Sequence, residues 1–113
     1  MENDKITRYQ AIVQRVLREY AEFGKRPYYI DMQLSFDTEH NHYHLFNVGW
    51  NDEHRIYGCL IHVDIKDDKI WIQHDGTEAV IADKFLELGV PPEDIVLAFH
   101  SPYRRQFTGF AVN

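Results

Sequence analysis

The sequence has few of the features that mark secreted and membrane proteins. It contains one cysteine, Cys59, so no disulfide can form within the chain. No stretch approaches the roughly 20 apolar residues that a helix needs to cross a bilayer. The first residues, Met1–Arg8, are polar and charged, and no apolar run follows them. We therefore expect no secretory signal, no membrane span and a reducing, cytoplasmic location.

Cationic residues are also scarce. The chain has 12 lysines and arginines against 18 aspartates and glutamates, for a formal net charge of −6. A protein that binds duplex nucleic acid gains affinity by neutralising phosphates with lysine and arginine, so this charge argues against direct nucleic-acid binding.

Apolar residues, in contrast, make up 44% of the 113 residues. That fraction is enough for one domain, residues 1–113, built around one core.

The spacing of apolar residues predicts a helix followed by strands. From Ile6 to Phe23 they recur every three or four positions, which is typical of one helix face, with Asp4 as the N-terminal cap and Gly24 as the stop. Alternation of apolar and polar residues then predicts four strands joined by short polar turns. These strands are Ile30–Asp37, Tyr43–Trp50, Arg55–Lys66 and Lys69–His74.

The last third of the chain completes an α+β pattern. A second helix is predicted over Glu78–Leu88, ending at Gly89, and a short strand over Ile95–Phe99. We expect a mainly antiparallel sheet, formed by a four-strand meander and a short late strand, with both helices on one face. In the third strand we expect the odd-numbered residues from Tyr57 to Ile65 to share the apolar face.

Histidines are the first candidates for a functional site. His40, His42 and His44 alternate, so on a strand they would project from one face, and imidazole nitrogens at that spacing can share a zinc ion. Such a site needs a further ligand that is held rigidly, and His40 falls in a polar turn. We therefore favour exposed strand histidines and assign no metal ligand.

A carboxylate–imidazole pair offers a second kind of chemistry. His62 and Asp64 share a strand face, and His74 and Asp75 end the neighbouring strand, so an acid and a base could meet there. No paired nucleophile or glycine-rich phosphate loop accompanies them. We assign no catalytic residue and no cofactor. A metal-dependent hydrolase remains the least favoured alternative, and it would use residues among His42, His44, His62 and Asp64.

The C-terminal segment is the strongest candidate for a binding surface. Aromatic residues alternate there with arginines, in Tyr103, Arg104, Arg105 and Phe107, a mixture that is enriched at protein interfaces. The alternative is a tail folded onto the sheet, with Tyr103, Phe107 and Phe110 in the core. Both can hold if the arginines stay outside while the rings pack inside.

Several long segments of the chain resemble the XisI family, the fdxN element excision controlling factor of cyanobacteria. The resemblance covers nearly the whole chain, in order. The segments that carry it are Asn47–Trp50, Arg55–Lys66, Lys69–Glu78, Leu88–Pro91 and Asp94–Thr108.

The resemblance implies a regulatory role. Proteins of this kind act with a partner, XisH, which resembles a restriction-endonuclease fold, and a site-specific recombinase then excises a DNA element during heterocyst differentiation. It brings no catalytic residues with it. The expectation is a non-enzymatic factor that binds a XisH-like protein, and an accessory factor that touches DNA directly is the alternative. The long strand Arg55–Lys66 and an exposed sheet face would also suit a homodimer.

Overall fold

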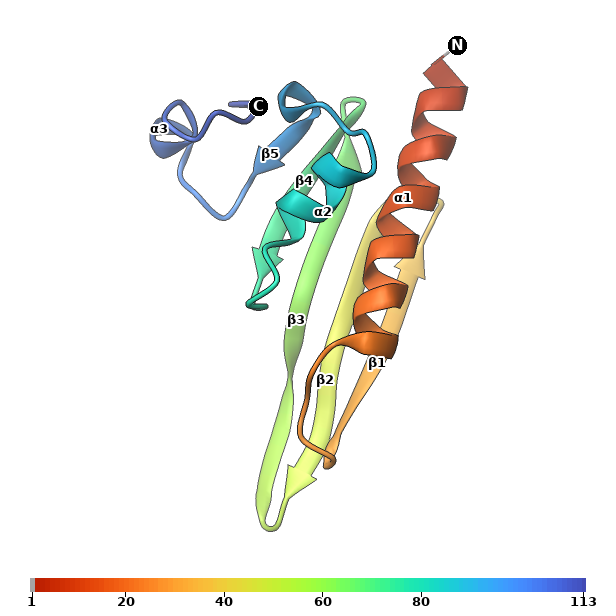
Figure 1. Cartoon of the computed structure of the whole chain (residues 1–113), viewed down its shortest axis with the longest axis vertical. Coiled ribbons are helices and arrows are strands. Elements are labelled where there is room, and N and C mark those ends of the chain that lie inside the picture. Colours follow the sequence, from red (N-terminus) through yellow and green to blue (C-terminus); the bar gives the residue numbers. More distant parts are fainter. Residues whose placement is uncertain (1) are drawn as a thin grey trace.

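The computed structural model describes residues 2–113 and has an α+β fold, as predicted (Figure 1). Its sheet has the order β1-β2-β3-β4-β5, in which the first four strands are antiparallel neighbours and β5 lies parallel to β4. Within residues 2–113, no helix is long and apolar enough to cross a membrane. The elements are α1 (Glu2–Phe23), β1 (Ile30–Asp37), β2 (His42–Asn51), β3 (His54–Lys66), β4 (Lys69–Asp75), α2 (Ile81–Glu87), the 3-10 turn η1 (Pro92–Asp94), β5 (Ile95–Leu97) and α3 (Pro102–Arg105).

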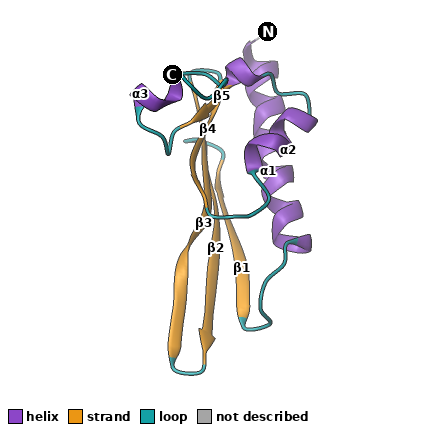
Figure 2. Cartoon of the chain, turned by 60° about the vertical axis from the view of Figure 1, so that its left-hand side comes forward, coloured by secondary structure: helices purple, strands orange, loops and turns teal. Residues whose placement is uncertain are grey.

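Helices α1 and α2 cover one face of the sheet, which confirms the predicted layers (Figure 2). The apolar stripe of α1 and the inner face of α2 meet the central strands in one core, because burying these stripes removes apolar surface from water. The largest side chains that are fully buried in this core are Tyr9, Tyr43, Phe85, Leu17, Leu45, Ile61, Ile70, Ile72, Ile81 and Ile95.

Both helices begin at positions other than those predicted. Helix α1 begins at Glu2, so Asp4 lies inside its first turn and is not the cap. Helix α2 begins at Ile81, three residues later than expected, because Asp75 holds the preceding loop. The Asp75 carboxylate accepts hydrogen bonds from the Thr77 hydroxyl (2.6 Å) and from the backbone N–H of Ile81 (2.8 Å). Asp75 therefore caps α2 from six residues upstream.

A β-bulge in β3 changes the face to which its residues point. Leu45 of β2 pairs with Ile61, but the next residue of β2, Phe46, pairs with Cys59. Leu60 has no partner across the ladder. An extra residue of this kind reverses the alternation of faces along a strand.

The bulge separates the two halves of β3. Ile61 and Val63 are fully buried against the helices, whereas Tyr57 is 68% exposed. The Tyr57 ring stacks instead on Phe46, with a centroid distance of 6.2 Å, on the face turned away from the helices. The prediction that the odd-numbered residues from Tyr57 to Ile65 share one face is therefore wrong.

Candidate functional site

The C-terminal segment forms a short helix, α3, beside the edge of the sheet. Ser101 precedes α3 in an extended conformation, and its hydroxyl oxygen accepts a hydrogen bond from the backbone N–H of Arg104 at 3.3 Å. Pro102 occupies the first helical position, where its missing N–H costs no hydrogen bond. The sequence Ser-Pro thus starts a helix at this point, in a tail for which the apolar spacing predicted no regular structure.

Arg105 attaches this segment to the body of the protein. Its guanidinium donates hydrogen bonds to the carbonyl oxygens of His100 (3.0 Å), Ala98 (3.3 Å) and Val112 (3.4 Å). The same group lies 5.6 Å from the centroid of the Trp71 ring, which is 8% exposed. Because the planar guanidinium has several donors in fixed directions, it can hold three chain segments together.

Two rings of this segment are exposed and one arginine is partly buried, which is the reverse of the arrangement in which both interpretations could hold. Tyr103 and Phe107 are 72% and 71% exposed, and their rings meet edge to face at 5.5 Å. Arg104 is exposed, whereas Arg105 is partly buried. Of the three rings that the alternative interpretation placed in the core, Phe110 alone packs against it.

Three exposed residues therefore make one surface, which we call the C-terminal patch: Tyr103, Arg104 and Phe107. At protein interfaces a few residues supply most of the binding energy, and aromatic residues and arginine are frequent among them. The structure thus divides the predicted site, Tyr103, Arg104, Arg105 and Phe107. Three of these residues form the patch, and Arg105 fixes the segment that carries them through its hydrogen bonds.

The histidines predicted to share a face are divided by the structure. His40 lies in the turn after β1, where its ring is 2.9 Å from the Asp37 carboxylate. His42 and His44 lie on β2, on the face turned away from the helices. There the His44 ring approaches that of His62, with a centroid distance of 4.2 Å.

On the same face, two histidines converge on one carboxylate oxygen. Asp64 Oδ1 is 2.7 Å from His42 Nδ1 and 2.8 Å from His62 Nε2. We call these three residues the histidine–aspartate cluster. The hydrogen bond to Asp64 raises the pKa of His42, whereas burial lowers the pKa of His44 because it disfavours the charged imidazolium. The pairing of His62 with Asp64 was foreseen from the sequence, but Asp75 lies apart as the cap of α2.

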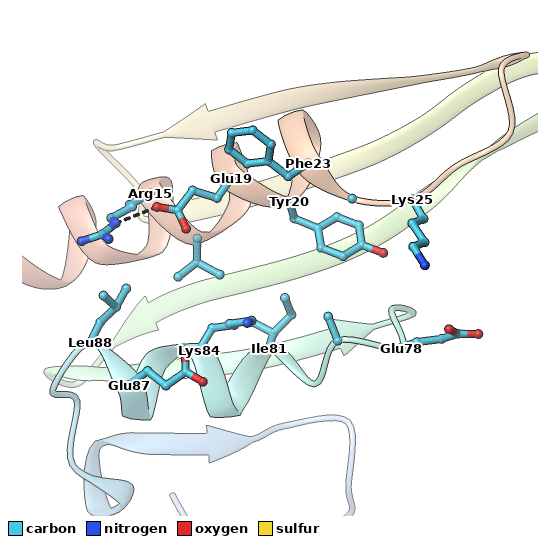
Figure 3. A pocket seen from close by; sticks show the side chains of 13 residues that line it. Arg15, Glu19, Tyr20, Phe23, Lys25, Glu78, Ile81, Lys84, Glu87 and Leu88 are labelled. Carbon is cyan, nitrogen blue, oxygen red and sulfur yellow. Dashed lines mark hydrogen bonds and ion pairs between the residues drawn. The ribbon is translucent and has the colours of Figure 1, made fainter.

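A groove between α1 and α2 was not foreseen from the sequence (Figure 3). Its volume is about 510 Å³. Val16, Tyr20 and Ile81 supply apolar lining, and its charged residues have both signs, including the ion pair Arg15–Glu19 at 2.8 Å. Because the charges balance, they select no particular class of ligand. The spacing within each helix could have indicated the two walls, but not the gap between them.

Comparison with known proteins places this fold in a family. The family described as XisI protein matches residues 3–112. A crystal structure of a XisI-like protein from Anabaena variabilis ATCC 29413 is 44% identical, with a TM-score of 0.89, over 96% of this chain and 99% of that one. The fdxN element excision controlling factor XisI from the same organism is 31% identical, with a TM-score of 0.84 and the same coverage. No curated protein matches the chain. This chain belongs to the XisI family.

Proposed function

We propose that this chain is a non-enzymatic regulatory factor that controls site-specific excision of a DNA element together with a XisH-like, nuclease-fold partner. One observation carries the proposal. The chain is 31% identical to a protein named as the fdxN element excision controlling factor, and the match covers 96% of this chain and 99% of that one. With a TM-score of 0.84 over that length, the two proteins share the whole fold.

The net charge supports action through a partner rather than on DNA itself. At −6, the chain is repelled by the phosphate backbone at long range. A nuclease-fold partner would supply the cations that contact DNA. An acidic control factor can then bind that partner without competing for phosphates.

The C-terminal patch is the surface that we assign to this partner. Tyr103 and Phe107 expose about 70% of their area, and Arg105 fixes the segment that carries them. A patch that is already ordered loses little conformational entropy on binding. Arg104 adds a cation that can pair with a carboxylate of the partner.

Co-expression with the XisH-like protein of the same genome tests the proposal. With a removable tag on one protein, we expect both to elute as one stable complex. Replacing Tyr103 and Phe107 together by alanine should weaken the complex at least about 10-fold, because exposed aromatic anchors dominate interface energy. Arg104→Ala should weaken it less. Arg105 is left intact because its loss would also release the tail.

Tyr28 provides the matched control. It is 99% exposed and lies in the loop after α1, at the opposite end of the molecule from α3 (Figure 1). Tyr28→Ala should leave the complex unchanged. Separate elution of the two wild-type proteins at low salt would overturn the proposal. Duplex binding that falls steeply with salt would then favour direct contact with DNA.

A further inference from the structure

The register of β2 and β3 brings three potential metal ligands together. His42 lies directly opposite Asp64 in the antiparallel ladder, and His62 precedes Asp64 by two residues on the same face. The ligand atoms of the three side chains, one from each, all lie within 4.8 Å of one another. From the sequence, the alternating histidines lacked a rigidly held further ligand. The pairing of β2 with β3 supplies it, because it places His42 opposite Asp64.

We propose that His42, His62 and Asp64 form a binding site for a divalent transition-metal ion of the Zn²⁺ type, on the sheet face turned away from the helices. Two imidazole nitrogens and one carboxylate oxygen are a ligand set that suits zinc, cobalt, nickel and copper. Calcium and magnesium prefer oxygen ligands alone, so this set selects against them. The inference does not depend on the partner proposed above.

The side-chain distances need only a small adjustment to hold an ion. Asp64 Oδ1 is 2.7 Å and 2.8 Å from the two imidazole nitrogens. Around a tetrahedral zinc ion with bonds of about 2.0–2.1 Å, neighbouring ligand atoms are about 3.3 Å apart. The imidazoles must therefore move about 0.5 Å away from the carboxylate oxygen, and the two imidazole nitrogens, which lie within 4.8 Å of each other, must reach the same separation of about 3.3 Å. Rotations of the side chains supply both changes.

The surroundings hold these ligands in place. Gln73 Nε2 donates a hydrogen bond to Asp64 Oδ2 at 3.3 Å, which leaves Oδ1 directed at the imidazoles. The His44 ring lies 4.2 Å from that of His62 and restricts its rotation. Both strands are anchored from the opposite face, where Leu45 and Ile61 are fully buried. Such outer contacts orient metal ligands and strengthen binding.

The cluster is also reachable from solvent. The side chain of His42 is 52% exposed and that of His62 31%, whereas that of Asp64 is 17% exposed. An ion can therefore enter from the open face and bind to a carboxylate that is largely screened from water. Three protein ligands leave a fourth position for water or for a group of another molecule.

Isothermal titration calorimetry with Zn²⁺ tests the site on the full, tag-free chain in a buffer that does not chelate metals. We expect one ion per chain. His62→Gln and Asp64→Asn should each weaken binding at least about 100-fold, since each removes a direct ligand. Gln73→Ala should weaken it about 10-fold, because it removes the hydrogen bond that orients the Asp64 carboxylate. Circular dichroism of every variant checks that it folds.

His54→Gln is the matched control, because His54 lies on the same strand but in its exposed hairpin end. It should leave the affinity unchanged. Titration with Co²⁺ adds a second readout, since d–d absorption bands report the coordination of the bound ion. The absence of saturable Zn²⁺ binding, or an affinity in His62→Gln equal to that of the wild-type chain, would overturn the proposal.

Discussion

Leu45 and Ile61 lie at one end of the β2–β3 ribbon and are fully buried, whereas Trp50 and Tyr57 lie at the other end and are 56% and 68% exposed. The strands are the same, and the pairing is antiparallel throughout. What differs is the face as well as its cover. Leu45 and Ile61 point toward α1 and α2, whereas the Tyr57 ring lies on the face turned away from the helices. Both helices also end before the ribbon does (Figure 2). The comparison teaches that alternation along a strand sets the direction of a side chain, while the neighbouring layer decides its burial.

The uncovered end has its own local contacts. The Arg55 guanidinium lies over the rings of both Trp50 and Tyr57, at 5.2 Å and 5.7 Å from their centroids. Contacts of this kind are worth about 0.5–1 kcal/mol at exposed sites. They order the rings but cannot replace a core. The stability of the protein should therefore depend on the two ends very unequally.

The largest expected effect is at the covered end. Leu45→Ala should lower the free energy of unfolding by about 2–5 kcal/mol, because it leaves a cavity in the core. Tyr57→Ala at the hairpin end should cost less than about 1 kcal/mol, since its ring is mostly in water. Urea denaturation at constant m-value measures both. Equal losses for the two variants would show that the hairpin end is covered in solution.

A second test concerns the contact that attaches helix α1 to the 3-10 turn η1. Tyr9 of α1 donates a hydrogen bond to Asp94, and burial together with this bond raises the pKa of Tyr9 to about 12 from an ordinary value of 10.0. As the pH rises, the Tyr9 hydroxyl loses its proton at a lower pH in the unfolded chain than in the folded chain. Burial of the neutral Tyr9 hydroxyl and its bond to Asp94 therefore favour the folded state fully below pH 10, and this contribution is lost as the pH rises to about 12.

The expected loss from Tyr9 over this pH range is about 2–3 kcal/mol, from two units of pKa shift. Tyr9→Phe removes the titrating group, so its stability should fall less between pH 10 and pH 12 than that of the wild-type chain. Urea denaturation at a series of pH values checks this. Parallel pH profiles for the two proteins would contradict the assignment to Tyr9.

A third test adds a methyl group at the uncovered end. A Cβ atom on Gly49 would lie 2.1 Å from the carbonyl oxygen of Tyr29, so Gly49→Ala forces the backbones of β1 and β2 apart. We expect a loss of about 1–3 kcal/mol. Gly58→Ala is the matched control, since a Cβ atom there meets nothing within 4 Å. If both variants are equally stable, the close approach of the strands is not rigid in solution.

The elements that sequence analysis located best are those with local causes. The apolar period of α1, the alternation in β1 to β4, and the turn at Asp67 and Asp68 all depend on neighbouring residues. Both aspartates of that turn have positive φ, 54° and 61°, as a two-residue hairpin turn requires. The start of α2 was missed because it depends on Asp75, six residues away.

The candidate site was harder to predict because its parts come from distant segments. Tyr103, Arg104 and Phe107 were named from their composition, and the structure leaves them exposed. That Arg105 lies inside could not be read from the sequence, since its partner ring, Trp71, is 34 residues away along the chain. Its three carbonyl partners are also brought together only by the fold.

By itself, the sequence determined the positions of α1, α2 and the five strands, the acidic charge and the resemblance to the XisI family. Composition, periodicity and matching segments are properties of the chain alone. Tertiary structure decided the bulge at Leu60, the exposure of the hairpin end and the meeting of His42 with Asp64, 22 residues apart. These features depend on strand register and on what covers each face. Register and cover are set by packing between distant segments, which no local pattern encodes.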